Sequence, residues 1–279
     1  LDIPSVGATE NIMLAAVLAQ GTTRIQNAAQ EPEIVDLANF LKAMGAQIEG
    51  AGTNEISICG VKQEDLHGVE YTTISDRIEA GTYMSAIIAS KGHGIIKNVF
   101  PNHLTIFTGK LLEMGAKIKL IEPNVMEVSS SSRLLPMNFI TQPYPGFPTD
   151  LQALAMALLS TSNGISVVTE SLYENRFMHI AELWKMGANI KQSKNHAIIK
   201  GVECLVGTSV TAPDLRAGAA LVVAAIMARG ESEIHGLHHI DRGYEKFTEK
   251  LKGLGVCVSR VSEDANALKT AGGINDSQI

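Results

Sequence analysis

The hydrophobic positions of the chain recur with a period of about 70 residues. Four apolar segments end at turn glycines, and each is followed 23 to 25 residues later by a second glycine. The pairs are Gly21 and Gly45, Gly92 and Gly115, Gly164 and Gly187, and Gly230 and Gly255. A fixed period of this length is typical of a protein built from stacked structural repeats. The sequence therefore predicts four copies of one unit.

The pattern inside a copy predicts the order helix, strand, helix, strand, strand. The first helix is apolar almost all round, as in the segment AALVVAAIMARG that ends at Gly230, so it should be buried on every side. The second helix has a single apolar stripe, because Leu104, Phe107, Leu111 and Met114 fall three and four residues apart. The following glycine suits a left-handed helix end. Alternating segments such as NIKQS and AIIKGV predict the closing strands.

Such units must stack to bury their first helices, which predicts an α/β fold with helices sharing an interior. Residues 74–262 contain three consecutive copies, enough for a closed domain, whereas residues 1–73 contain one copy. We expect the single copy to depend on repeats outside this sequence and to expose its apolar helix without them. Residues 263–279 are polar and aperiodic and are interpreted as a tail.

Composition and charge narrow the function classes. The chain of 279 residues is 45% hydrophobic and 19% charged, as in an ordinary globular protein of the cytoplasm. Its net charge of −6 without a basic cluster argues against nucleic acid as a partner. The longest apolar run, Ala217 to Ala228, is too short to span a membrane. Three unrelated cysteines and eight histidines show no metal-ligand spacing, so no metal or disulfide framework is expected.

Candidate chemistry lies at the predicted helix starts. Fourteen residues before each first glycine the chain has Gly7, Ile78, Asp150 and Arg216. Helix N-termini present unpaired N–H groups and the positive end of the helix dipole, so they suit anionic ligands. The acids near these positions, Asp76, Asp150 and Asp214, fit an N-cap role equally well. Both interpretations stay open from the residues alone.

A second set of repeat positions lies at the predicted starts of the second helices, twelve residues after each first glycine. These are Glu33, Leu104, Arg176 and Arg242. An arginine at a helix start works against the helix dipole, so we expect it to pair with an acid or to bind an anion. An Arg–Asp pair holding copies together and an anion site in a crevice between copies remain alternatives.

Seven short segments of the sequence carry a resemblance to a known family. In chain order they are SVGATEN, EPEIVDLANFL, SDRIEAG, YPGFPTD, ENRFMH, DLRAG and HIDRGYE. Together they resemble the UDP-N-acetylglucosamine enolpyruvyl transferase family, over residues 1 to about 262. The resemblance implies two inside-out α/β barrels of three repeats each, of which this chain has the last four repeats.

The resemblance also implies an activity. The family transfers the enolpyruvyl group of phosphoenolpyruvate to the 3′-hydroxyl of UDP-N-acetylglucosamine and releases phosphate, in the first committed step of peptidoglycan synthesis, which supports cell shape and division. It works in the cytoplasm without metal or other cofactor. The small-molecule substrates are therefore the expected partners, with neither nucleic acid nor membrane.

Residue roles follow by resemblance. Asp150 contacts and deprotonates the sugar hydroxyl. Ser5, Val6 and Gly7, at a helix start, hold the uridine diphosphate through backbone N–H groups. Leu172 supplies an apolar and backbone contact to the sugar nucleotide. Three more bind phosphoenolpyruvate: Arg242, Arg216 and Asp214.

Other parts of the family site have no counterpart in this sequence. The family's Lys-Asn pair, its loop Cys or Asp acid and nearby arginines belong to the earlier repeats. None of Cys59, Cys204 and Cys257 matches that loop. We therefore expect the chain alone to be inactive, with the missing repeats supplied by the rest of the protein or by another chain.

Two alternatives belong beside the transferase. One is an inactive remnant that binds sugar nucleotide or regulates a paralogue, and intact FPTD and HIDRGYE segments disfavour it. The other is the sister shikimate 3-phosphate enolpyruvyl transferase, whose site has no use for SVGATEN or ENRFMH.

Overall fold

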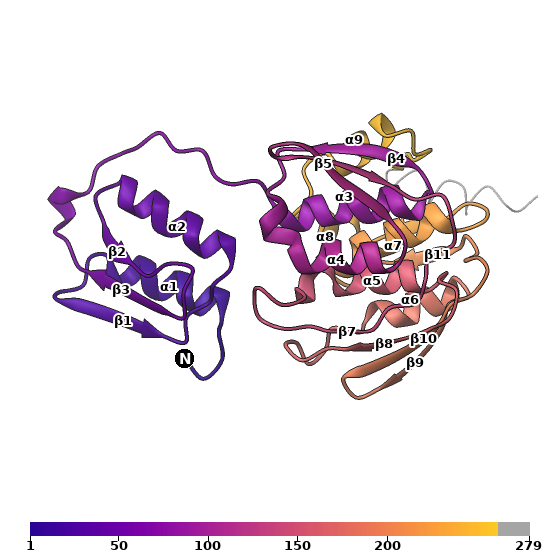
Figure 1. Ribbon diagram of the computed structural model, residues 1–279, viewed down its shortest axis with the longest axis horizontal. Helices are drawn as coiled ribbons and strands as arrows, with labels where there is room; N and C mark the ends of the chain where they lie inside the picture. The colour runs from indigo at the N-terminus through magenta and orange to yellow at the C-terminus, as the bar shows by residue number, and fades with distance from the viewer. Residues whose placement is uncertain (262–279) are drawn as a thin grey trace, which may run out of the picture.

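The computed structural model describes residues 1–261, and the tail predicted for residues 263–279 lies outside this range. Two separate hydrophobic cores divide the described chain. One core runs from Met13 to Ile58 and defines the N-terminal unit; the other runs from Ile78 to Leu251 and defines the C-terminal unit. Figure 1 shows the two units connected by a segment that lacks regular strands.

The N-terminal unit has the predicted order of elements. Its three strands form one antiparallel sheet in the order β1-β3-β2. Met13, Ile34 and Ile56 are fully buried between this sheet and the two helices. The elements are α1 (Val6–Ala16), β1 (Thr22–Gln26), α2 (Pro32–Ala43), β2 (Gln47–Glu49) and β3 (Glu55–Cys59), followed by the short helix η1 (Gln63–Asp65).

The first copy in the C-terminal unit repeats this arrangement, with the sheet order β4-β6-β5. Its second helix buries the predicted stripe, since Leu104, Phe107, Leu111 and Met114 are at most 2% exposed. The elements are α3 (Arg77–Ala89), β4 (His93–Lys97), η2 (Pro101–Leu104), α4 (Thr105–Glu113), β5 (Lys117–Glu122) and β6 (Val125–Ser129).

The next copy begins with a strand that the sequence pattern missed. β7 (Phe139–Ile140) pairs in parallel with β8 (Ile165–Thr169), which gives the sheet order β7-β8-β10-β9. Two residues are too few to show an alternation of apolar and polar positions. The other elements are η3 (Thr149–Leu151), α5 (Gln152–Leu159), α6 (His179–Lys185), β9 (Asn189–Ser193) and β10 (His196–Lys200).

The last copy departs from the predicted order. It contains a parallel pair, β11 with β12, and residues 254–261 form no strand, although closing strands were expected in every copy. Arg242 directly follows α8, so its predicted place at a helix start is wrong. The elements are β11 (Ser209–Thr211), α7 (Leu215–Met227), β12 (Glu233–His235), α8 (Leu237–Asp241) and α9 (Phe247–Gly253).

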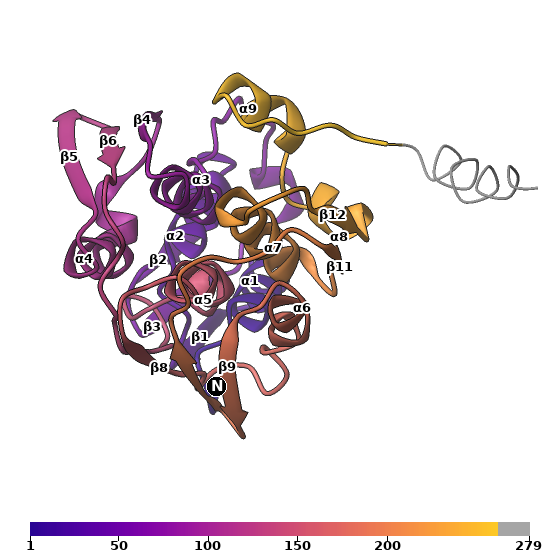
Figure 2. The ribbon, with the colours of Figure 1, turned by 90° about the vertical axis from the view of Figure 1, so that its right-hand side faces the viewer.

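The apolar helices lie inside the C-terminal unit and the sheets lie outside. In Figure 2, α3, α5 and α7 stand side by side in the middle with strands around them, and the three helices pack on one another. All eight residues of α5 are buried. Each helix is covered by the other two, so the side chains of its continuous apolar segment are removed from water. This is the inside-out α/β barrel fold expected from the sequence.

The glycines that end the second helices have the expected conformation. Gly45, Gly115, Gly187 and Gly255 have φ values of +113°, +95°, +89° and +88°. Residues with a side chain rarely adopt this region, so glycine closes each helix without strain. None of the helices described in residues 1–261 is long and apolar enough to cross a membrane.

Candidate functional site

The four residues at the matched repeat position all take the second place of a helix. Gly7 follows the first residue of α1, Ile78 that of α3, Asp150 that of η3 and Arg216 that of α7. The register predicted from the glycines is therefore reproduced in three dimensions. In the C-terminal unit this position brings the acidic residue Asp150 into contact with the basic residue Arg216 of the next copy.

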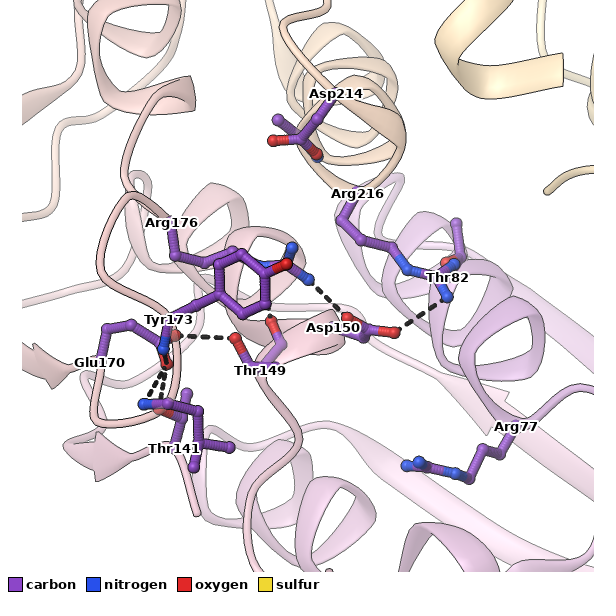
Figure 3. Close-up of polar contacts among 12 residues, drawn as sticks. Arg77, Thr82, Thr141, Thr149, Asp150, Glu170, Tyr173, Arg176, Asp214 and Arg216 are labelled. Atoms are coloured by element: carbon purple, nitrogen blue, oxygen red, sulfur yellow. Dashed lines mark hydrogen bonds and ion pairs between the residues drawn. The ribbon is translucent and has the colours of Figure 1, made fainter. Parts of the chain in front are cut away.

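Asp150 is held between two arginines (Figure 3). Its Oδ1 accepts from Arg176 at 2.5 Å, and its Oδ2 accepts from Arg216 at 3.0 Å. The arginine side chains are 13% and 16% exposed, whereas that of Asp150 is 37% exposed. Asp150 therefore keeps an open side toward solvent while both cations lie deeper.

The capping hypothesis holds for two of the three acids. Asp76 accepts from the N–H of Ile78 at 2.7 Å, and Asp214 accepts from that of Ala217 at 2.8 Å. Asp150 makes no such bond, and its carboxylate is committed to the arginines instead. The Arg–Asp pairing between copies that the sequence left open is therefore present, since Arg216 belongs to the copy after that of Asp150.

The guanidinium of Arg216 is largely buried and is surrounded by charged and polar groups. Burial by itself lowers the pKa of its guanidinium, but Asp150 and further partners outweigh burial, so the net pKa is raised above its ordinary value. One of its terminal nitrogens, Nη1, is buried and has no hydrogen-bond partner in the described chain. Arg216 is thus a permanent cation that interacts with both Asp150 and the hydroxyl of Tyr244.

Tyr244 packs beside Arg216 at the centre of the unit. Its hydroxyl is 2.8 Å from Oγ1 of Thr82 and it is 2% exposed. Burial raises the pKa of the Tyr244 hydroxyl, although Thr82 and the positive charge of Arg216 act in the opposite direction. Tyr244 therefore stays neutral and connects the segment after α8 to α3.

Glu170 is a site residue that the sequence interpretation missed. It directly follows β8, is 2% exposed, and accepts hydrogen bonds from Thr141, Thr149, Leu172 and Tyr173. Because a glutamate is rarely buried unless it is paired, these partners mark a point where separate segments of the chain are tied together. The sequence offered only an isolated Thr-Glu-Ser segment, without periodicity to mark it.

The other residues predicted from the sequence each have a different local environment. Leu172 is 38% exposed, but its N–H donates to Glu170 at 2.9 Å and is not free for a ligand. Arg242 is exposed and makes no hydrogen bond or ion pair within residues 1–261. Arg176 lies three residues before α6 rather than at its start.

The predicted nucleotide loop is the beginning of α1. Ser5 is its N-cap, and Oγ of Ser5 accepts from the N–H of Ala8 at 3.3 Å. Val6 and Gly7 are the first two helical residues, and a Cβ at Gly7 would meet no atom within 4 Å. Among the described residues, no hydrogen bond joins this helix start to the Asp150 cluster.

A cavity of about 300 Å³ lies beside the FPTD turn, and Arg77, His103, Tyr144 and Pro148 are among its lining residues. A second cavity, of about 480 Å³, lies between α3, β4 and α9. Asp150 lines neither. Within residues 1–261, no three acid, histidine or cysteine side chains are grouped so as to hold a metal ion.

Comparisons with known proteins agree on one family. The sequence profile described as EPSP synthase (3-phosphoshikimate 1-carboxyvinyltransferase) matches residues 1–251. The chain is 59% identical to UDP-N-acetylglucosamine 1-carboxyvinyltransferase 2 of Carboxydothermus hydrogenoformans, over 94% of this chain and 62% of that protein. It is 55% identical to the Bacillus subtilis protein of the same name, over 93% of this chain and 60% of that protein. The chain thus spans about three fifths of the length of these relatives.

Solved structures extend the comparison to the fold. The crystal structure of the enolpyruvyl transferase NikO from Streptomyces tendae matches with a TM-score of 0.80 and 28% identity, over 89% of this chain and 59% of that one. An EPSP synthase from Acinetobacter baumannii matches with a TM-score of 0.68 and 21% identity, over 91% of this chain and 61% of that one, which shows the fold alone. With a profile match over nine tenths of its length, the chain belongs to the EPSP synthase family.

Proposed function

We propose that the chain contributes to the transfer of the enolpyruvyl group from phosphoenolpyruvate to the 3′-hydroxyl of UDP-N-acetylglucosamine, with release of phosphate. The observation that carries the proposal is the Asp150 cluster, in which a partly exposed acid lies between two less exposed cations. The 59% identity to a carboxyvinyltransferase named for this sugar nucleotide supports the choice of acceptor.

Asp150 is the base for the acceptor hydroxyl in this proposal. The proton of the 3′-hydroxyl passes to a carboxylate oxygen, while the sugar oxygen forms a bond to C2 of phosphoenolpyruvate. The exposed side of Asp150 supports access by a sugar. In the later elimination the bond between C2 and the phosphate oxygen breaks and the methyl carbon loses a proton, which forms the enol ether of the product and releases phosphate. The acid that protonates the methylene carbon is not assigned to any residue of this chain.

Arg216 and Arg242 bind the anionic groups of phosphoenolpyruvate in this proposal, and Asp214 caps the helix that carries Arg216. The raised pKa of Arg216, which keeps it positively charged, and the exposed guanidinium of Arg242, which has no hydrogen-bond or ion-pair partner within residues 1–261, support this role. Guanidinium groups match phosphate and carboxylate in a bidentate fashion. Arg216 is then shared between Asp150 and the substrate.

The sugar nucleotide binds through the start of α1 and through Leu172. The free N–H groups of Val6 and Gly7 at a helix N-terminus suit a diphosphate, because the helix dipole favours negative charge there. Since the N–H of Leu172 is engaged with Glu170, its contribution comes from its exposed side chain or its carbonyl.

We further propose that residues 1–73 form one repeat of a barrel whose other repeats lie outside this chain, and that residues 74–262 form a three-repeat barrel. The exposed apolar side chains of Leu14 in α1 and of Leu18 just after this helix support the first part. On this view the protein works in the cytoplasm, where both substrates are found, and residues 1–279 alone do not turn over.

Replacement of Asp150 tests the function. In the full-length protein, Asp150→Asn should lower turnover by about two to four orders of magnitude, because removal of a general base typically costs that much. The assay follows phosphate release with both substrates present. Asp65→Asn, at a surface turn of the N-terminal unit, is the matched control and should keep full turnover. Near-normal turnover of Asp150→Asn would assign Asp150 a purely structural role.

A second variant tests the phosphoenolpyruvate site. Arg242→Ala should raise KM for phosphoenolpyruvate by about ten- to a hundredfold, because a charge-assisted contact is lost. KM for the sugar nucleotide should change little. Equal changes in both values would contradict the assignment.

Shikimate 3-phosphate is the competing acceptor, because the matching profile carries the name of the enzyme that acts on 3-phosphoshikimate. Full-length protein assayed with each acceptor separately should release phosphate only with UDP-N-acetylglucosamine. Release with shikimate 3-phosphate alone would reverse the choice, and binding of sugar nucleotide without turnover would favour the inactive remnant.

A further inference from the structure

Glu170 accepts four hydrogen bonds at the centre of the site loops. Its Oε1 accepts from the hydroxyl of Thr141 at 2.7 Å and from the N–H groups of Leu172 and Tyr173 at 2.9 and 3.1 Å. Its Oε2 accepts from the hydroxyl of Thr149 at 2.9 Å. These four donors satisfy the hydrogen-bonding capacity of the buried carboxyl group on both oxygens.

The four donors come from three separate segments of the chain. Thr141 follows β7, Thr149 opens η3 directly before Asp150, and Leu172 and Tyr173 begin the loop that leads to Arg176. Figure 3 shows Glu170 next to Thr141, with Thr149 between Glu170 and Asp150. One buried side chain therefore ties the turn that carries Asp150 to the loop that carries its cation.

Arg176 closes the network from the other side. It contacts Asp150, its Nε donates to the carbonyl oxygen of Thr149 at 3.4 Å, and its guanidinium lies 5.3 Å from the centre of the Tyr173 ring. The contacts run from Glu170 through Thr149 to Asp150, then through Arg176 and Tyr173 back to Glu170. Displacing any member disturbs the direction of the Asp150 carboxylate.

We propose that Glu170 is a positioning residue for Asp150 and Arg176. It acts through Thr149 and Tyr173 and takes no part in proton transfer. The proposal rests on the proposed function, in which Asp150 is the base. Its physical basis is that a buried carboxylate cannot lose its donors without a large desolvation cost, so it fixes the segments that supply them.

Two substitutions separate positioning from chemistry. Glu170→Ala removes every acceptor and frees all three segments. Glu170→Gln keeps the shape, since its amide oxygen accepts from Thr141 and the two N–H groups while its amide nitrogen donates to the hydroxyl oxygen of Thr149. A positioning role therefore survives in the Gln variant, whereas a role as proton carrier does not.

The kinetic test uses the full-length protein with both substrates. Glu170→Ala should lower kcat on the order of a hundredfold, the effect of misplacing a reacting group by about 1 Å. KM for the sugar nucleotide should rise with it, because Leu172 is released. Glu170→Gln should stay within about tenfold of the parent, the difference between charge-assisted and neutral hydrogen bonds.

Glu182→Ala is the matched control. Glu182 is also shielded, with a side chain 14% exposed, and it accepts from the N–H of Thr211 at 2.8 Å. This contact stabilises β11 and does not involve the Asp150 cluster. The control should lower the melting temperature and leave kcat and both KM values unchanged.

Hydrogen exchange separates this inference from the proposed function. The amides of Leu172 and Tyr173 should exchange faster in Glu170→Ala than in the parent and at parent rates in Glu170→Gln, whether or not the protein turns over. If Glu170→Ala does not fold, Thr149→Val removes one hydroxyl and should lower kcat without loss of the fold.

Three outcomes would overturn the inference: unchanged kcat in folded Glu170→Ala, a Gln variant as impaired as the Ala variant, or unchanged exchange at Leu172 and Tyr173. Absence of transfer in the parent protein, with the exchange result as expected, would instead overturn the proposed function alone.

Discussion

Leu14 of α1 and Val223 of α7 occupy the same repeat position, seven residues before the first glycine, and they differ completely in exposure. Leu14 is 52% exposed, whereas Val223 and its equivalents Ser85 and Ala157 are 0% exposed. α7 packs against α3 and α5, while α1 packs mainly against α2, β1 and β3. An apolar helix of this kind packs against strands of its own copy and is covered on its remaining faces by helices of neighbouring copies.

Both units bury polar groups with and without hydrogen-bond partners in the described chain, and in the N-terminal unit the atom without a partner is Oε2 of Glu31. In the N-terminal unit, Oγ1 of buried Thr9 accepts from the N–H of Ala29 at 3.1 Å. In the C-terminal unit, both ring nitrogens of buried His179 and the side-chain amide of Gln152 lack hydrogen-bond partners within the described chain. The larger core therefore carries polar groups that depend on staying neutral.

The largest predicted effect comes from placing a charge at the shared repeat position. Val223→Asp buries an unpaired carboxylate and should lower the free energy of unfolding by about 3–5 kcal/mol. Leu14→Asp leaves the new charge in water and should change the free energy of unfolding by less than about 1 kcal/mol. Urea unfolding of the 279-residue chain, followed by circular dichroism, measures both. Equal losses would contradict the environments described above.

The same two variants, Leu14→Asp and Val223→Asp, also compare the two units in the full-length protein. If further repeats cover α1 there, Leu14→Asp should become as destabilising as Val223→Asp, because its carboxylate is then buried. Retention of the small effect in the longer chain would refute the proposal that residues 1–73 complete a second barrel.

The second effect in size is an acid sensitivity confined to the C-terminal unit. Burial lowers the pKa of His179 from 6.5 to about 4; the charge of Asp214 and the backbone of Arg176 oppose the shift, and the positive charge of Arg176 adds to it. Between these pH values the unfolded chain binds a proton that the folded chain does not. Stability is therefore fully present above pH 6.5 and falls on acidification, by an amount on the order of 3 kcal/mol.

His179→Phe should flatten this part of the stability profile. Urea unfolding at a series of pH values between neutral and mildly acidic conditions measures the difference from the parent, so titration of other groups cancels. His238→Gln, which changes an exposed histidine of the same unit, should keep the parental slope. A parental slope in His179→Phe would contradict the prediction.

The smallest predicted effect lies at the junction between the units. Arg77 of α3 donates to Glu33 of α2 at 3.0 and 3.3 Å, and the Glu33 side chain is 42% exposed. Because solvent screens the pair, a double-mutant cycle with Arg77→Ala and Glu33→Ala should give a coupling below about 1 kcal/mol.

The exposed pair Lys110 and Glu113 provides the control cycle. A coupling at the junction well above that of the control would mean that the two units stabilise one another as one body. The two units could then no longer be treated as packing independently of one another.

The repeats were readable from the sequence because their signals are local. Gly115 and Gly187 end helices through a backbone conformation that depends on neighbouring residues, and the stripe of Phe107 and Leu111 follows from helical geometry. Local rules also placed Asp150 and Arg216 at matched helix starts. They failed for β7, β11 and the place of Arg242, where short strands and a short helix leave no periodic pattern.

The sequence by itself determined the copies and their apolar helices, and it predicted Asp150 and Arg216 as candidate site residues at matched helix starts. Only the tertiary structure decided which groups meet: Arg176 and Arg216 reach Asp150 across 26 and 66 residues of chain, and Glu170 joins three segments. Hydrophobic periodicity reports which face of an element is buried, and it carries no information about which distant face covers it. The pairing of Asp150 with two cations is therefore a product of barrel closure, because stacking α5 against α7 brings the two helix starts together.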